Sequence, residues 1–575
     1  DGLTSSSTIL VQESDSTTNA IRLTSDANEG FLQVYKAGVQ KVQIRGDGNN
    51  YIIDNNFGLG TSTPSATIDV VGTIKLDGNY PVGLGNVGMG DDALASLTDG
   101  GYNTAVGRLS LNSNTSGVYN TAFGNTSLRD NVTGDRNVAV GMLALTDNTV
   151  SDNTAVGYAA AQNNTTGTSI VAIGKDALLA NTTGFSNVAV GSDALTANTI
   201  GNQNVAVGIE AMRDNVAADR NVAIGRAALK VMTSATTADT YNTAVGYFAL
   251  TSTTSGTNNS ALGGQALNDN TTGASNTALG GSTLKNNTTG NNNTATGVIS
   301  MFQNTTGSNN TAYGYNSLGD NTTANDSVAI GHNALALSTA SQSTAVGKSA
   351  LGANTTGVKN TAVGYASMDN NTTGQWNVAM GWQSLFDNVT GQRNVAIGYS
   401  ALENNTVNHN VGVGMQAMFT NTSGTGNVAI GDSALRQNTT GSDNTAIGSY
   451  NGSILSALYS NTTGASNTAI GQGALKANTT ASNNTAVGKD ALGANTTGTD
   501  NVAVGRTALD ANTTGDNNTA VGKNAAGSNT TGIGITAIGE AALGSNTTAN
   551  YNTSLGFQAA YGNTTGTENI GIGHN

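Results

Sequence analysis

Apolar and polar residues alternate in a short unit that recurs about every 17 residues between Asn86 and Asn569. One regular copy reads Asn484-Thr-Ala-Val-Gly-Lys-Asp-Ala-Leu-Gly-Ala-Asn-Thr-Thr-Gly-Thr-Asp500, and its residues define positions one to seventeen. Among 29 such copies position five is always Gly, position three is Ala in 25, and position nine is mostly Leu or Met. Position four is apolar or aromatic in every copy except at Thr296. A period this short and strict is typical of a solenoid.

Positions two to four predict a β-strand, since β-branched residues at two and four share one face and Ala at three points to the other. Gly at positions five and fifteen marks two corners. The fold class expected is therefore all-β, a parallel β-solenoid or β-roll of 17-residue coils. We expect two short strands per coil, a rise of about 4.8 Å per coil and a rod of roughly 140 Å. The repeat positions are represented by Asn377, Ala379, Gly381, Leu385, Ala396, Ile397, Gly398 and Leu402.

The small side chain at position three suggests an assembly of several chains. One Leu and one Val per coil bury too little apolar surface to offset the ordering of a whole coil, so a second burial surface is needed. We expect a homotrimer in which positions four and nine fill each coil and the Ala at position three faces the shared axis.

The period is broken in a few places. Three copies, which begin at Asn137, Ser327 and Asn394, are 16 residues long. Two copies are longer, through insertions near Val231 to Tyr241 and Ser449 to Leu455. Loops on a regular scaffold commonly carry binding residues, so these insertions, with Tyr241 and Tyr450, are candidate contact loops.

Residues 1–80 lack the period and contain short β-branched runs separated by Gly, Asn and Asp. The runs at Thr8–Gln12, Ala20–Thr24, Phe31–Tyr35, Val39–Ile44 and Tyr51–Ile53 are typical of strands joined by turns. We expect a small β-rich connector over 1–80 and a repetitive shaft over 81–575.

Composition narrows the possible partners. Hydrophobic residues make up 37% of the chain. The net charge is −14, so the sequence offers no basic surface for nucleic acid. The chain has no Cys, which excludes disulfides and thiolate metal sites. No apolar run is long enough to span a bilayer, and we expect no membrane insertion.

Catalytic chemistry has little support in the sequence. The three His lie in different copies, and Gly347-Lys-Ser349 lacks the earlier Gly of a phosphate loop because Gln342 stands there. We expect no enzyme activity, no cofactor and no metal, although the Asp91-Asp92 corner could hold an isolated Ca²⁺. The recurrent Asn-Thr-Thr triplets fit either glycosylation sequons or stacked Asn ladders, and the ladders are favoured. Ice binding by Thr columns is disfavoured because position two is expected to be buried.

Exposed aromatic residues are the candidate contacts for a glycan or protein receptor. Many of them fall at position six, where they could form a broken column on the outer wall or simply shield a corner. The candidates are Trp376, Trp382, Tyr158, Tyr247, Tyr365, Tyr399, Phe557, Tyr241 and Tyr450.

The copies at Ser327-Val-Ala-Ile-Gly331, Asn221-Val-Ala-Ile-Gly225 and Asn427-Val-Ala-Ile-Gly431 resemble the head of trimeric autotransporter adhesins, which is a left-handed parallel β-roll with a shorter coil. The whole repeat, with the leader Gly58-Leu-Gly-Thr-Ser-Thr-Pro-Ser-Ala66, is also similar to phage tail-fibre proteins. The resemblance implies an extracellular fibre on a virion or a bacterial surface. We expect the structural shaft and receptor-attachment part of a trimeric tail fibre. A bacterial adhesin or filament subunit is the alternative, and an ice-binding protein or carbohydrate-active enzyme is less well supported.

Overall fold

The computed structural model describes residues 6–12, 20–26, 29–36, 39–45, 51–52 and 84–575, apart from 234–235. The chain divides into two compact units, Asp1–Asp77 and Gly78–Asn575. The Gly58 to Ala66 leader and Ile53 lie outside the described residues.

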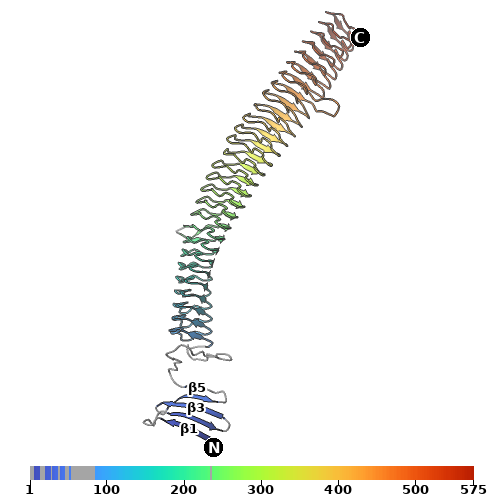
Figure 1. Cartoon of the computed structure of the whole chain (residues 1–575). Coiled ribbons are helices and arrows are strands. Elements are labelled where there is room, and N and C mark those ends of the chain that lie inside the picture. The colour runs from blue at the N-terminus through green and yellow to red at the C-terminus, as the bar shows by residue number, and fades with distance from the viewer. Residues whose placement is uncertain are drawn as a thin grey trace. The chain divides into compact units, whose positions relative to one another are not determined.

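The first unit contains one antiparallel sheet with its five strands in sequence order (Figure 1). Its strands are β1 (Ser6–Gln12), β2 (Ala20–Asp26), β3 (Glu29–Lys36), β4 (Val39–Arg45) and β5 (Tyr51–Ile52). The register of β3 and β4 shifts between Val34 and Tyr35. The predicted strands are confirmed in this region, and the residues between them lie outside the described residues.

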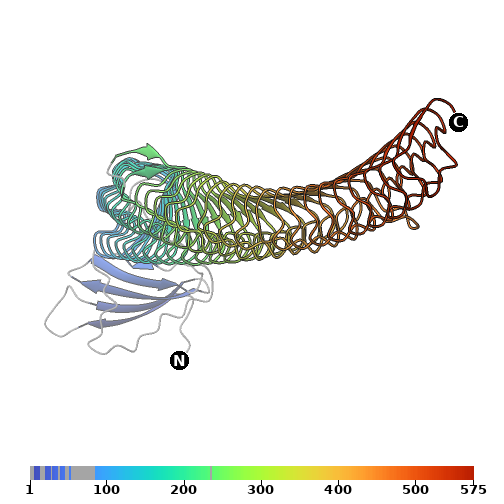
Figure 2. The same cartoon turned by 90° about the horizontal axis from the view of Figure 1, so that it is seen from above.

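The second unit is a stack of coils in which each repeat contributes one three-residue strand (Figures 1 and 2). These strands are β6 (Val87–Met89), β7 (Thr104–Val106), β8 (Thr121–Phe123), β9 (Val138–Val140), β10 (Thr154–Val156), β11 (Val171–Ile173), β12 (Val188–Val190), β13 (Val205–Val207), β15 (Val222–Ile224), β17 (Thr243–Val245), β18 (Ser260–Leu262), β19 (Thr277–Leu279), β20 (Thr294–Thr296), β21 (Thr311–Tyr313), β22 (Val328–Ile330), β23 (Thr344–Val346), β24 (Thr361–Val363), β25 (Val378–Met380), β26 (Val395–Ile397), β27 (Val411–Val413), β28 (Val428–Ile430), β29 (Thr445–Ile447), β30 (Thr468–Ile470), β31 (Thr485–Val487), β32 (Val502–Val504), β33 (Thr519–Val521), β34 (Thr536–Ile538), β35 (Thr553–Leu555) and β36 (Ile570–Ile572). The strands pair in parallel, and each position faces the same position of the next coil, as Val378 faces Val395. The ladder begins where β6 pairs with β7 and ends where β35 pairs with β36. The predicted parallel β-solenoid is confirmed.

The coil carries one strand instead of the two that the sequence predicted. Its other side is made of turns, yet these turns are also hydrogen-bonded from coil to coil. In the coil that begins at Asn377, the N–H of Gln383 donates to the carbonyl of Tyr365 at 2.9 Å, and the N–H of Leu385 donates to that of Ala401 at 2.9 Å. Backbone groups outside the strand are thus satisfied by both neighbouring coils.

The prediction of which residues fill the coil was wrong at positions three and four. Ala379 and Ala396 at position three are fully buried inside the coil, together with Leu385 and Leu402 at position nine, whereas Ile397 at position four is 38% exposed. The interior of the coil has no room for a side chain larger than Ala at position three. A methyl group added at Gly412, which occupies position three, would lie only 3.0 Å from Cγ of Leu402. The side chains at positions two and four therefore point outward, and position two is not buried as expected.

Position five needs Gly for the reason predicted. Gly381 and Gly398 have φ of 142° and 133°, and a Cβ on Gly381 would lie 2.3 Å from the carbonyl oxygen of Gly398. Positions seven, nine and seventeen are also left-handed, although they carry side chains; φ is 49° at Gln383, 53° at Leu385 and 57° at Arg393. Each such residue costs about 1 to 2 kcal/mol, which the hydrogen bonds between coils must offset.

Candidate interaction surfaces

Two ladders of Asn side chains fix the coils in place from within. In the first ladder, the N–H of Asn377 donates to Oδ1 of Asn360 at 3.0 Å, and most coils bind position one of the coil before them in this way; Ile170 and Ile535 interrupt the ladder. In the second, Nδ2 of Asn388 donates to Oδ1 of Asn371 at 2.9 Å. Both ladders meet at position fifteen, where the carbonyl of Gly391 accepts from Asn377 and Asn388 at 2.8 and 3.0 Å. The predicted Asn ladders are confirmed.

The burial of these Asn side chains decides whether the Asn-X-Thr triplets can be glycosylated. Asn371 and Asn388, which begin Asn-X-Thr triplets, are fully buried and hydrogen-bonded. A glycan cannot be attached to such a side chain in the folded coil, because the amide nitrogen is inside. Glycosylation at position twelve is therefore incompatible with this fold.

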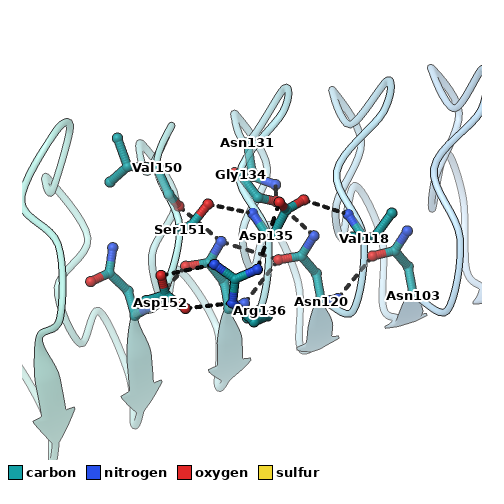
Figure 3. A network of polar contacts seen from close by, with 12 residues as sticks. Asn103, Val118, Asn120, Asn131, Gly134, Asp135, Arg136, Val150, Ser151 and Asp152 are labelled. Atoms are coloured by element: carbon teal, nitrogen blue, oxygen red, sulfur yellow. Dashed lines mark hydrogen bonds and ion pairs between the residues drawn. The ribbon is translucent and has the colours of Figure 1, made fainter.

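Figure 3 shows how the ladders adapt to a 16-residue coil. In an ordinary 17-residue coil the carbonyl at position fifteen accepts from both ladders. In the coil that begins at Asn120, the carbonyl of Gly134 accepts from Asn120 at 2.8 Å and from Asn131 at 2.9 Å. In the following short coil the carbonyl of Val150 takes this place and accepts from Asn137 at 2.9 Å. The missing residue thus lies in the Asn-Thr-Thr-Gly turn. Among the described residues, Oδ1 of Asn131 is one of two buried side-chain atoms without a hydrogen-bond partner, and Nδ2 of Asn148 in the short coil donates to the carbonyl of Val150 at 2.7 Å instead.

The outer face of the ladder is free of charge along its whole length, and its position four is apolar or aromatic except at Thr296. Position two is Val, Thr, Ser or Ile, and position four is Val, Ile, Leu, Met, Phe, Tyr or Thr. Side chains at position four reach 55% exposure at Phe123 and 60% at Tyr313. This outer face mixes Val with Thr and varies in side-chain size, which differs from the uniform Thr array that ice binding uses.

Aromatic residues at position six form a short stack on the wall of the coil. Trp382 lies between Tyr365 and Tyr399, with ring centroids 6.0 and 4.8 Å apart and nearly parallel planes. Both faces of the indole are therefore covered by neighbouring rings, although the residue is still 41% exposed. Trp376 lies at position seventeen, across the strand, with the guanidinium of Arg393 at 5.1 Å from its ring.

The remaining aromatic candidates are separate from this stack. Tyr158, Tyr247 and Phe557 are each 44–50% exposed at position six. Tyr247 contacts Phe248 edge-on at 4.2 Å, and Phe557 stacks on His574 at 5.0 Å. The predicted column thus consists of separate segments, and contact with a receptor stays a prediction.

The first insertion extends one corner of the stack. Its residues 238–239 form β16 (Ala238–Asp239), which pairs in parallel with β14 (Ala218–Asp219) of the preceding coil. The hydroxyl of Tyr241 accepts from Arg220 at 2.9 Å and donates to Asp239 at 3.0 Å. Residues 234–235 lie outside the described chain.

The second insertion is an irregular loop at residues 449–455 that carries the exposed Tyr450. Oδ1 of Asn451 accepts from the N–H groups of Ser453 and Ile454 at 3.1 and 3.0 Å. Gly452 follows with φ of 90° and open space around it.

Titratable groups are few and lie mainly on the turns. Burial raises the pKa of the Asp369 carboxyl, and a hydrogen bond from the backbone of Gly352 acts in the opposite direction. No group of three or more His, Asp or Glu side chains in the described residues is placed to hold a metal ion, at Asp91-Asp92 or elsewhere. Nor does the described part of the chain contain a helix with the length and apolar character needed to cross a bilayer.

Comparisons of the chain with protein-family models, curated proteins and solved structures found no match.

Proposed function

We propose that this chain forms the structural shaft and the receptor-attachment part of a trimeric extracellular fibre, most like a phage tail fibre. The single observation that carries the proposal is the uncharged outer face, which is continuous over 29 strands and carries an apolar or aromatic side chain at position four in all but one of them. With two outward side chains per strand, it offers about twice the 20 to 30 residues that each partner contributes to a standard interface.

The proposed role is mechanical. A stack of coils with hydrogen bonds at every level resists bending and holds contact sites away from the particle that carries it. Copies bound side by side present each contact site several times, so weak contacts with a glycan or protein receptor add up to firm attachment.

Light scattering coupled to size-exclusion chromatography tests the assembly. The test variant replaces four neighbouring residues at position four with Lys: Val363, Met380, Ile397 and Val413. Its matched control adds the same charge at four exposed residues of position fourteen: Thr356, Thr373, Thr390 and Ser423. We expect trimers for the unmodified chain and the control, and dissociation of the position-four variant because buried unpaired charges are costly. Equal masses for all three, or a monomeric unmodified chain, would contradict the proposal.

Attachment is tested by removing the contact loops. Deletion of residues 231–234 and 449–454 returns both coils to the regular length. We expect a trimer of unchanged mass that binds whole target cells more weakly in a sedimentation assay. Unchanged binding would exclude these loops as the contact site.

A further inference from the structure

Position six carries a planar or cationic side chain in six consecutive coils near the middle of the stack. This position-six strip consists of Tyr315, His332, Lys348, Tyr365, Trp382 and Tyr399. All six side chains are exposed. Beyond the stack around Trp382, the ring of Tyr315 stacks on that of His332 at 5.2 Å, and Nζ of Lys348 lies 5.8 Å from the ring centroid of Tyr365.

The fold itself does not require aromatic residues at position six. Gly264 and Gly281 hold this position in two successive coils, and a Cβ added at Gly281 would meet no atom within 4 Å. These coils keep the same hydrogen bond to the preceding coil, since the N–H of Ser282 donates to the carbonyl of Gly264 at 2.8 Å. A corner that closes without a side chain needs no cover, so the exposed rings of the strip indicate a role outside the coil.

The polar groups of the strip are not used by the chain. Within the part of the chain that the structure describes, the hydroxyls of its three tyrosines and Nε1 of Trp382 make no hydrogen bond. The hydroxyl of Tyr459, at position ten, by contrast accepts from Arg436 at 3.1 Å. The strip thus combines apolar ring surface with free hydrogen-bonding groups, which suits a ligand that has both characters. A pyranose is such a ligand, because it carries C–H groups on its faces and hydroxyl groups around its rim.

The spacing of the strip favours a polymer of sugars. Equivalent side chains recur once per coil, about 4.8 Å apart, over six coils. A pyranose in an equatorially linked chain advances by nearly the same distance, so successive sugars of an extended glycan meet equivalent positions. A protein receptor has no such period, and a standard protein interface involves about 20 to 30 residues a side, whereas the strip is one side chain wide.

The charge of the strip narrows the class of glycan. The chain has 36 Asp and Glu against 22 Lys and Arg, yet positions six to eight carry no acidic residue in any of these six coils. Lys348 adds a positive charge and forms no salt bridge with a described residue. Charges farther away than about 8 to 10 Å are largely screened at physiological salt. A glycan with carboxylates is therefore attracted at Lys348 and meets no carboxylate at positions six to eight.

We propose that the position-six strip binds an extended, equatorially linked glycan that carries carboxylates, with the glycan along the stack and one sugar per coil. The bend at position five separates this site from positions two and four, which the proposed assembly assigns to other copies. The inference rests on the proposed role in receptor attachment, and it names the chemistry of the receptor and the residues that bind it.

Tryptophan fluorescence tests the inference in the full-length chain. The chain has two Trp, so Trp376→Phe leaves Trp382 of the strip as the sole reporter. Hexamers of β-1,4-linked mannuronate, β-1,4-linked glucose and α-1,4-linked glucose are titrated; the first two are extended and the third is coiled. We expect saturable changes in emission, with the mannuronate hexamer binding tightest and the α-linked hexamer at least about tenfold more weakly. Affinity should rise at least about tenfold from dimer to hexamer and then level off, because the strip ends after six coils.

A matched pair of variants assigns the binding to the strip. Tyr365→Ala with Tyr399→Ala removes the rings on both sides of Trp382, whereas Tyr158→Ala with Tyr247→Ala removes rings at the same position outside the strip. We expect the first pair to weaken binding of the mannuronate hexamer at least about tenfold and the second to change it by less than about twofold.

No saturable binding, equal affinity for the three hexamers, or equal loss in the two variant pairs would overturn the inference. Tighter binding of the β-linked glucose hexamer than of mannuronate would overturn the assignment of a carboxylate-bearing glycan. Loss of cell attachment in the strip variant without glycan binding would identify a protein receptor instead. Light scattering on the same samples separates this inference from the fibre proposal. A trimer that attaches to cells but binds no glycan contradicts only the inference, whereas a monomer that binds the mannuronate hexamer contradicts only the trimeric fibre.

Discussion

Two adjacent glycines, Gly263 and Gly264, offer a sensitive test of how the coils are held together. Gly263 occupies position five with φ of 140°, and an added Cβ would lie 2.4 Å from the carbonyl oxygen of Gly280 in the next coil. At Gly264 the nearest heavy atom is 4.0 Å away, and φ is not in the left-handed region. Gly263→Ala and Gly264→Ala thus make the same chemical change at consecutive residues in opposite environments.

The expected loss of stability in Gly263→Ala has two contributions. A side chain in this region of φ costs about 1 to 3 kcal/mol, and overpacking against a rigid backbone costs a similar amount, so Gly263→Ala should destabilise its coil by at least about 3 kcal/mol. At 1.4 kcal/mol per tenfold change, this is more than about a hundredfold increase in local opening. Gly264→Ala should change opening by less than about twofold, because exposed substitutions usually stay within 0.5 kcal/mol.

Hydrogen exchange followed by mass spectrometry measures this effect coil by coil. We expect faster exchange for Gly263→Ala in β17 to β19, with distant coils such as that of β32 unchanged, since a solenoid transmits stability mainly to its neighbours. Equal exchange in the two variants would refute the argument that close backbone approach fixes the Gly at position five.

Three further predictions concern the core, the charges and the outer face. Leu385→Ala should lower the free energy of local unfolding by about 2 to 5 kcal/mol by leaving a cavity, whereas Val389→Ala, at a residue 42% exposed, should have little effect in the same exchange assay. Because burial raises the pKa of Asp369, the folded coil takes up that proton more readily than the unfolded chain. Asp369→Asn should therefore stabilise the protein at pH 7, and this gain in stability should shrink as the pH falls towards 4. Urea unfolding at both pH values measures the gain. A gain that grows on acidification would contradict a raised pKa of Asp369 in the folded coil. Tyr313→Lys should weaken assembly because it places an unpaired charge on the outer face, whereas Thr306→Lys, at an exposed residue of position fourteen, should not, as measured by dissociation in sedimentation velocity; equal weakening in both variants would argue against an interface at the outer face.

Much of the coil could be predicted from the repeat itself. The period, the strand at positions two to four, the Gly at position five and the Asn ladders each follow from a residue type that only one local geometry tolerates. The direction in which the strand faces was predicted wrongly, because alternation groups positions two and four without saying which face is inside. The deciding signal was the range of sizes: position four varies from Thr296 to Tyr313, which a narrow interior could not accommodate, while position three is nearly always Ala.

Other features could not be predicted from residue preferences. Leu385 and its equivalents adopt a left-handed conformation that Leu rarely takes, because the turn is held by hydrogen bonds to the next coil at Leu385 and to the preceding coil at Gln383. The stacking of Trp382 between Tyr365 and Tyr399 follows from the identical placement of position six in successive coils.

The Asn ladders also bear on how the protein ages chemically. Deamidation proceeds when the backbone nitrogen of the following residue attacks the side-chain amide carbon and ammonia leaves, which requires a mobile amide, an accessible backbone and water. Asn377 and Asn388 are buried, are bound to carbonyl oxygens and are followed by bulky Val. Asn451 is hydrogen-bonded only within its own loop, lies in an exposed segment, and is the one Asn in the sequence followed by Gly. A chain exceptionally rich in a labile residue thus keeps its ladder amides intact, and its first conversion to aspartate or isoaspartate is expected in the second insertion.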